Sequence, residues 1–215
     1  FLSPLFSMNR DSMRAILSRY YEEPVSAFFE KLGFSPNGVT LLGLAVTCVS
    51  ALFIGAGALL IGGLVMLSGA ALDLIDGGLA RRKGIATKFG ALLDSVSDRI
   101  QEAIVLLGLL IYYLNSPSDS VLGVFSYDKL GVILSYTAFI GSILVSYLRA
   151  RSEGLGIECK IGIMTRPERV LALGFGLVVA HWAPSAVMIV LFVLTVLGLL
   201  TTAQRLYHSW STLEE

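Results

Sequence analysis

An uncharged stretch from Leu32 to Leu72 limits the fold more than any other feature of the sequence. A helix needs about 20 apolar residues to cross the hydrocarbon core of a bilayer, and this stretch is about twice that long. It therefore predicts two consecutive membrane-spanning helices. Four glycines in its second half are expected to form the turn between them, namely Gly55, Gly57, Gly62 and Gly63.

The composition extends this interpretation to the whole chain. Hydrophobic residues make up 55% of the sequence and charged residues 15%, a balance typical of an integral membrane protein. Six spans are expected, over Val39–Ala58, Gly63–Arg81, Phe89–Leu114, Leu130–Leu148, Val170–Ala183 and Ser185–Thr202. The predicted fold class is therefore an all-α bundle of six transmembrane helices.

Residues 1–31 carry apolar and basic side chains at helical spacing, with Met13, Ile16, Leu17 and Tyr20 on one face. This pattern predicts an N-terminal juxtamembrane amphipathic helix at the membrane surface, although an ordinary surface helix has the same pattern. The predicted organisation has three parts. They are the juxtamembrane segment 1–31, a six-helix transmembrane domain 32–208 and a short tail 209–215.

The positions of the basic residues orient these spans. With six spans, both termini lie on one side of the membrane, and of the 16 Lys and Arg residues only Lys129 falls on the opposite side. The positive-inside rule makes the side with the termini cytoplasmic. We therefore expect a multi-pass protein of the cell (inner) membrane. The net charge of zero gives no reason to expect a nucleic-acid partner.

Four aspartates gather at the facing ends of the second and third expected spans. Asp73 and Asp76 are three residues apart, and Asp94 and Asp98 are four apart, so each pair shares one helix face. Carboxylates that converge in an apolar setting repel one another, and a divalent cation relieves that repulsion. Oxygen ligands without His or Cys favour Mg²⁺, Mn²⁺ or Ca²⁺ over zinc. Mg²⁺ commonly shares its site with substrate phosphates, so a phosphate-bearing substrate is also expected.

The residues from Asp73 to Asp98 follow the pattern D-x2-D-G-x2-A-R-x8-G-x3-D-x3-D. This pattern resembles the signature of the CDP-alcohol phosphotransferase family. The resemblance implies that residues 32–208 form a catalytic domain that transfers a phosphatidyl-type group from CDP-diacylglycerol or CDP-archaeol to an alcohol hydroxyl, releasing CMP. It further implies two Mg²⁺ or Mn²⁺ ions held by the four aspartates, with Asp98 as the catalytic general base, and a homodimer. The topology expected from the basic residues places the active site at the cytoplasmic face.

The segment from Ser35 to Thr40 resembles a family element that touches the CDP-linked lipid. Without the resemblance it is an ordinary helix start, in which Ser, Asn and Thr can cap. The residues that the resemblance assigns to CDP-lipid binding are Asn37, Gly38, Val39, Thr40, Gly77, Arg81 and Thr87.

Five arginines form a second polar constellation on the same side of the membrane. They are Arg149 and Arg151 at the end of the fourth span, Arg166 and Arg169 at the start of the fifth, and Arg205 near the end of the last. They could converge on one anion, or they could be solvated loop residues that obey the positive-inside rule. The strings Y-L-R-A-R, R-P-E-R and Q-R-L around them resemble family members that act on inositol phosphate. The resemblance therefore implies that these arginines bind the phosphate of an acceptor.

Two alternatives remain open at this point. Glycerol 3-phosphate is also phosphorylated and would suit the same arginines. Outside the enzyme class, four membrane carboxylates could serve a divalent-cation transporter. A transporter would hold its carboxylates near the bilayer midplane, whereas these four gather at one end of their spans, which favours the enzyme.

Overall fold

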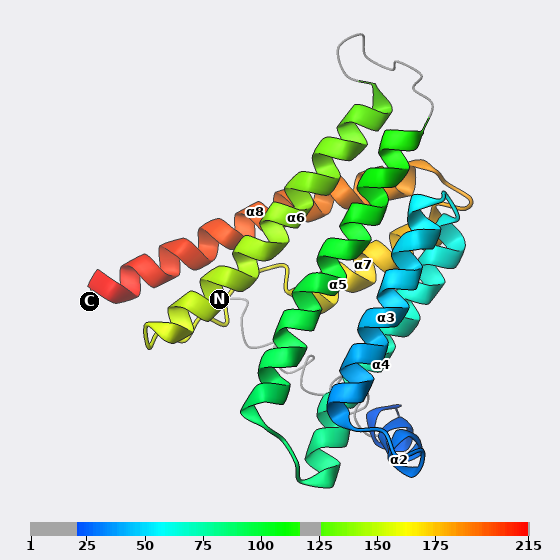
Figure 1. Cartoon of the computed structure of the whole chain (residues 1–215). Helices are drawn as coiled ribbons and strands as arrows, with labels where there is room; N and C mark the ends of the chain where they lie inside the picture. The colour runs from blue at the N-terminus through cyan, green and yellow to red at the C-terminus, as the bar shows by residue number, and fades with distance from the viewer. Residues whose placement is uncertain (1–20, 117–125, 215) are drawn as a thin grey trace. The chain divides into compact units, whose positions relative to one another are not determined.

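The computed structural model describes residues 21–116 and 126–214 (Figure 1). Regular secondary structure in these residues is helical. The helices are α2 (Glu23–Lys31), α3 (Pro36–Gly55), α4 (Leu59–Lys83), α5 (Lys88–Asn115), α6 (Tyr127–Gly154), α7 (Arg166–Val179) and α8 (Ser185–Glu214). The all-α fold is therefore confirmed for the described part of the chain. Most of the expected amphipathic segment 1–31 lies outside the described residues, and α2 is its last part.

The helices from α3 to α8 correspond in order to the six expected spans. Four of them, α3, α4, α6 and α8, are long and apolar enough to cross a membrane. The other two differ from that pattern for separate reasons. Helix α7 has 14 residues, fewer than the ~20 that a crossing needs, and the first half of α5 carries several charged residues. Among the described residues, four helices are thus candidate membrane spans by length and composition, and the count of six stays a prediction.

The glycines between the first two spans have two different roles. Gly57 lies in the turn between α3 and α4 with a φ of 83°, which glycine adopts without steric cost. Gly62 and Gly63, assigned above to the same turn, lie inside α4 instead. A Cβ on Gly62 would lie 2.5 Å from Ile54 Cγ1, and one on Gly63 would lie 2.8 Å from Leu177 Cβ. The turn is therefore shorter than predicted, and these two glycines let other helices pack closely against α4.

Two compact units share these helices along the chain. The first unit comprises Phe1–Ala45 and Ser68–Asp98, and the second comprises Val46–Leu67 and Arg99–Glu215. In the first unit, the buried side chains of Val39, Ile75 and Leu79 form an apolar cluster. The side chains packed around this cluster are Tyr21, Val25, Phe29 and Leu72. The cluster joins α2 to α3 and α4. The domain boundaries expected at residues 31 and 208 stay a prediction.

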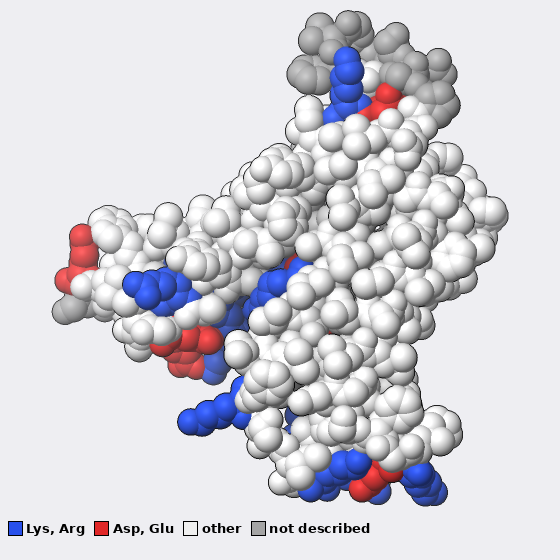
Figure 2. Space-filling model, in the orientation of Figure 1, with Lys and Arg blue, Asp and Glu red and all other residues white. Residues whose placement is uncertain are grey.

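The second unit has a larger apolar core, whose fully buried members include Leu109, Leu177 and Leu191. Other large apolar side chains point outward, for example Leu52, which is 74% exposed, and Ile189, which is 60% exposed. On the face shown in Figure 2, uncharged residues cover most of the surface, and the charged residues gather in a few groups. Exposed large apolar side chains on such a surface are unfavourable in water and suit contact with lipid tails.

Candidate metal and nucleotide site

A glycine and a threonine shape the loop between α4 and α5. Gly84 has a φ of 64°, in the left-handed region, and the amide N–H of Ile85 donates to the carbonyl oxygen of Ala80 at 3.1 Å, which closes α4. Thr87 then caps α5, because its hydroxyl accepts a hydrogen bond of 2.9 Å from the amide N–H of Gly90. This loop brings the end of α4 and the start of α5 together within the first unit.

Three of the four aspartates meet at this junction. Asp73 and Asp76 on α4 and Asp94 on α5 each offer one carboxylate oxygen, and these atoms lie within 4.8 Å of one another. Three oxygen donors at such separations fit a hard divalent cation such as Mg²⁺ or Mn²⁺. The donor set therefore agrees with the cation expected from the sequence. Asp98, one turn further along α5, is not part of this group of three.

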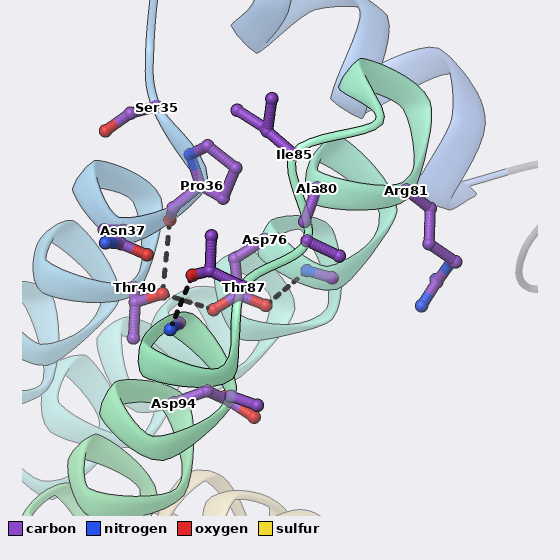
Figure 3. Close-up of a pocket in the computed structure, with 14 residues that line it drawn as sticks. Ser35, Pro36, Asn37, Thr40, Asp76, Ala80, Arg81, Ile85, Thr87 and Asp94 are labelled. Carbon is purple, nitrogen blue, oxygen red and sulfur yellow. Dashed lines mark hydrogen bonds between the residues drawn. The ribbon is translucent and has the colours of Figure 1, made fainter.

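Asp76 is the aspartate whose surroundings are best defined. It is 7% exposed, and both of its oxygens accept hydrogen bonds. The hydroxyl of Thr40 on α3 donates to Oδ2 at 2.5 Å, and the amide N–H of Gly77 donates to Oδ1 at 2.5 Å (Figure 3). These two donors hold the carboxylate in one orientation, as is typical of groups that support metal ligands.

A pocket of about 410 Å³ opens beside this carboxylate group. It is lined by the first turns of α3, the end of α4 and the start of α5, all within the first unit (Figure 3). The residues expected to bind CDP-lipid that line it are Asn37, Thr40, Gly77, Arg81 and Thr87. Asp76 and Asp94 line it as well. The pocket therefore joins the carboxylates to the nucleotide-binding residues that the sequence suggested.

Two other residues assigned to the CDP-lipid have different surroundings. Val39 is fully buried in the apolar cluster of the first unit, and Gly38 donates its N–H to the hydroxyl of Ser35 at 3.1 Å. Neither belongs to the described lining of the pocket. Ser35, in contrast, lines the pocket although it was not among the residues assigned to CDP-lipid binding.

Gly90, a position of the signature pattern, also lines the pocket. A Cβ at Gly90 would lie 3.1 Å from Thr87 Oγ1 and 3.2 Å from Asn37 Oδ1. The missing side chain keeps the space between these two polar groups open. The signal in the sequence was the place of this glycine in the motif, which does not by itself show what the glycine faces.

The five arginines of the second constellation lie in the second unit, where they make different contacts. Arg149 and Arg151 are exposed, and Arg149 pairs with Glu153 at 2.9 Å. Arg166 donates to Gln101 Oε1 at 3.3 Å. Arg205 is 3% exposed and donates from Nε to the carbonyl oxygen of Ile161 at 2.9 Å and from Nη1 to that of Val145.

Arg169 is held most firmly of the five. It is 2% exposed, and its Nε and Nη2 donate to the two carboxylate oxygens of Glu102 at 2.6 and 3.0 Å. Its Nη1 donates to the carbonyl oxygen of Met164 at 3.3 Å. Phosphate binding by Arg169 would require an exchange of these bonds. Sequence reasoning missed Glu102, although an acidic residue within an expected span is a signal for a buried partner.

Comparisons with known proteins agree with this geometry. A family model described as CDP-alcohol phosphatidyltransferase matches residues 34–202. The archaetidylinositol phosphate synthase of Methanothermobacter thermautotrophicus is 29% identical over 208 residues, which cover 95% of this chain and 95% of the relative. The phosphatidylinositol phosphate synthase of Corynebacterium glutamicum is 35% identical over 189 residues, which cover 86% of this chain and 81% of the relative.

A solved structure is similar as well. The phosphatidylinositol phosphate synthase of Mycobacterium tuberculosis, crystallised with CDP-DAG bound, superposes with a TM-score of 0.76 at 30% identity, over 89% of this chain and 94% of that one. The same enzyme was also crystallised in complex with manganese and citrate. The family match includes the complete motif from Asp73 to Asp98 and most of the chain. The chain therefore belongs to the CDP-alcohol phosphatidyltransferase family.

Proposed function

We propose that this enzyme transfers a phosphatidyl-type group from a CDP-linked lipid to a hydroxyl of inositol phosphate and releases CMP. The observation that carries the proposal is the group of Asp73, Asp76 and Asp94 beside a pocket whose lining includes Gly77, Ala80, Arg81 and Gly90 of the family signature. The acceptor is supported by two relatives whose names, phosphatidylinositol phosphate synthase and archaetidylinositol phosphate synthase, both contain inositol phosphate. The lipid is CDP-diacylglycerol or CDP-archaeol.

The pocket residues bind the CDP part of the lipid. Arg81 presents several N–H donors to the diphosphate, Gly77 lets the phosphate approach the backbone, and Thr87 offers a hydroxyl proton. Asn37 and Thr40 contact the ligand from the start of α3, with Gly38 and Val39 shaping that helix turn. A divalent metal ion held by the aspartates would draw charge off the diphosphate. We propose two such ions, Mg²⁺ or Mn²⁺, with Asp98 as the fourth carboxylate ligand.

Asp98 also acts as the general base. It takes the proton from the acceptor hydroxyl, whose oxygen forms a bond to the lipid-bearing phosphorus. The bond between that phosphorus and the oxygen of CMP breaks, and CMP leaves with the electron pair. Because little covalent work falls to the protein in phosphoryl-type transfer, the positions of the carboxylates and donors provide most of the catalysis.

The acceptor phosphate binds to the cationic constellation of the second unit, which comprises Arg149, Arg151, Arg166, Arg169 and Arg205. The exposed pair, Arg149 and Arg151, is able to reach a dissolved anion without breaking buried contacts. The buried pair, Arg169 and Arg205, supports the site by holding the chain segment between α6 and α7 in place. We further propose a multi-pass homodimer in the cell (inner) membrane whose active site faces the cytoplasm.

An acceptor-dependent CMP-release assay tests the proposed reaction. With purified protein, Mn²⁺ and CDP-diacylglycerol, kcat/KM is expected to be at least about 10-fold higher for inositol phosphate than for glycerol 3-phosphate. Unphosphorylated inositol serves as the control for the role of the phosphate and is expected to be a poor acceptor. A preference for glycerol 3-phosphate would assign the enzyme to that acceptor instead, and repetition with CDP-archaeol identifies the lipid class.

Arg151→Gln is expected to raise the KM for inositol phosphate about 10-fold or more and to leave the KM for the CDP-linked lipid unchanged. A hydrogen bond from a charged donor contributes about 1.5–3 kcal/mol, which corresponds to that factor. Steady-state kinetics with each substrate varied in turn measures both constants. Lys160→Gln is the control, because Lys160 is an exposed cation of the same segment that pairs with Glu158. If both changes had equal effects on the KM for inositol phosphate, the five arginines would serve only to orient the protein in the membrane.

A further inference from the structure

Helix α2 lies against α4 through a close contact at Gly78. A Cβ on Gly78 would lie 2.6 Å from Glu22 Cγ and 2.8 Å from Ser26 Oγ. Ser26 is 1% exposed, and its hydroxyl donates to the carbonyl oxygen of Ile75 at 3.4 Å. Together with the apolar cluster of the first unit, these contacts fix the start of α2 on α4.

Glu22, the residue directly before α2, pairs with Arg81 at the end of α4. Arg81 donates from Nη2 to Glu22 Oε1. The Glu22 side chain is 18% exposed and the Arg81 side chain 64% exposed. The carboxylate is therefore the better-anchored partner, and it restricts the long exposed arginine side chain.

The free end of this pair lies at the nucleotide pocket. A Cβ on Gly77 would lie 3.4 Å from Arg81 Nη1, so this nitrogen lies over Gly77. Gly77 and Arg81 both line the pocket beside the aspartates (Figure 3). One nitrogen of the guanidinium is thus bonded to Glu22, while the other lies near Gly77, a residue of the pocket lining.

A second ion pair joins the same two helices without reaching the pocket. Arg82 donates from Nε to Glu30 Oε2 at 2.5 Å. The described lining of the pocket includes Arg81 but not Arg82. The two pairs share their chemistry and both helices, and they differ in whether the arginine lines the pocket.

We propose that Glu22 is a positioning residue for CDP-lipid binding: it holds the Arg81 guanidinium by Nη2 so that Nη1 faces the diphosphate. The inference rests on the proposed function, in which Arg81 binds that diphosphate. An arginine that is already restricted loses less conformational freedom when the phosphate binds, so preorganisation raises affinity without adding a contact to the ligand. Helix α2 thereby contributes to the nucleotide pocket although its own side chains do not need to touch the ligand.

Glu22→Gln is expected to raise the KM for CDP-diacylglycerol about 3- to 10-fold, because the arginine is no longer held before binding. The values of kcat and of the KM for the acceptor are expected to stay within about twofold of the wild type, since the chemistry and the second unit are unchanged. Glu30→Gln is the matched control and is expected to leave all three constants unchanged. Equal thermal unfolding midpoints of the two variants in detergent would exclude a difference in folding.

Two further variants test whether Glu22 acts through Arg81. In an Arg81→Gln background, the added Glu22→Gln change is expected to have no further effect on CDP-diacylglycerol binding, because the group that Glu22 positions is gone. Gly78→Ala places a methyl group on the Glu22 side chain and is expected to raise the KM for CDP-diacylglycerol as Glu22→Gln does. Equilibrium binding of CDP-diacylglycerol by the single and double variants measures these effects independently of turnover.

Three results would overturn the inference. The first is a Glu22→Gln enzyme with the CDP-diacylglycerol affinity of Glu30→Gln. The second is tighter binding by Glu22→Gln, which would mean that Glu22 competes with the phosphate for Arg81. The third is additive losses in the double variant. A wild-type enzyme that does not bind CDP-diacylglycerol, or an Arg81→Gln variant that binds it normally, would instead overturn the proposed function and the inference with it.

Discussion

Asp76→Asn is expected to lower the rate of CMP release about 1000-fold or more and to abolish the uptake of Mn²⁺ in the presence of CDP. Loss of one carboxylate from a group of three removes a ligand charge, and metal-based stabilisation of transferring phosphates amounts to several kcal/mol. Isothermal titration calorimetry with Mn²⁺ and an assay of CMP release measure the two effects.

The surroundings of Asp76 allow the asparagine to fold in the same place. The Thr40 hydroxyl lies 3.2 Å from the carbonyl oxygen of Pro36 as well as 2.5 Å from Asp76. It can donate to Pro36 and accept from the new amide, while the amide oxygen still accepts from the N–H of Gly77. A loss of activity with an unchanged unfolding midpoint would therefore report the lost ligand. Turnover and Mn²⁺ uptake near those of the wild type would remove Asp76 from the metal site.

Asp98→Asn tests the proposed general base in the same assays. Since Asp98 is not in the group of three, this variant is expected to lose transfer while it still binds the CDP-linked lipid. Asp128→Asn, which changes an aspartate at the start of α6, is the control for removing a carboxylate elsewhere. If Asp98→Asn retained turnover, another group would have to accept the proton.

The aspartate site was largely predictable because its information is local. Spacings of three and four residues place each pair on one helix face, and Gly84 lies between the pairs, where the chain must turn. Family membership then decides between an enzyme and a cation transporter in favour of the enzyme. The bond from Thr40 to Asp76 could not be predicted in this way, because it depends on how α3 packs beside α4.

The arginines show where reasoning from sequence reaches its limit. Arg169 lies in the first turn of α7 and Arg151 in the last turn of α6, so from sequence both look like cations of a loop near a phosphate site. The structure separates them by burial, since Arg169 is 2% exposed and Arg151 is exposed. That difference follows from Glu102, which is distant in sequence and close in space. A charged residue in an apolar span predicts a partner of opposite charge, but it does not show which residue that partner is.

Glu102→Gln is expected to lower the free energy of unfolding by about 3–5 kcal/mol, because it leaves the Arg169 guanidinium buried without a countercharge. Glutamine keeps one amide oxygen, which still accepts from Ser142 and from Arg169 Nε, so the loss comes from the missing charge and from the bond of Arg169 Nη2 to the second oxygen. Chemical unfolding in detergent micelles measures the change. Glu153→Gln removes the exposed Arg149–Glu153 pair and is the matched control, with an expected effect of at most about 0.5 kcal/mol.

A double substitution distinguishes the loss of a favourable pair from the presence of an unpaired charge. Glu102→Met combined with Arg169→Met removes both charges and leaves apolar side chains of suitable volume. Replacing a buried ion pair in this way is often neutral or stabilising, so the double variant is expected to recover most of the stability that Glu102→Gln loses. If the double variant were as unstable as Glu102→Gln, the bonds themselves would be the source of stability. If Glu102→Gln and Glu153→Gln were equally stable, Arg169 would have another countercharge. Glu102 would then not be the residue that holds Arg169 at the start of α7.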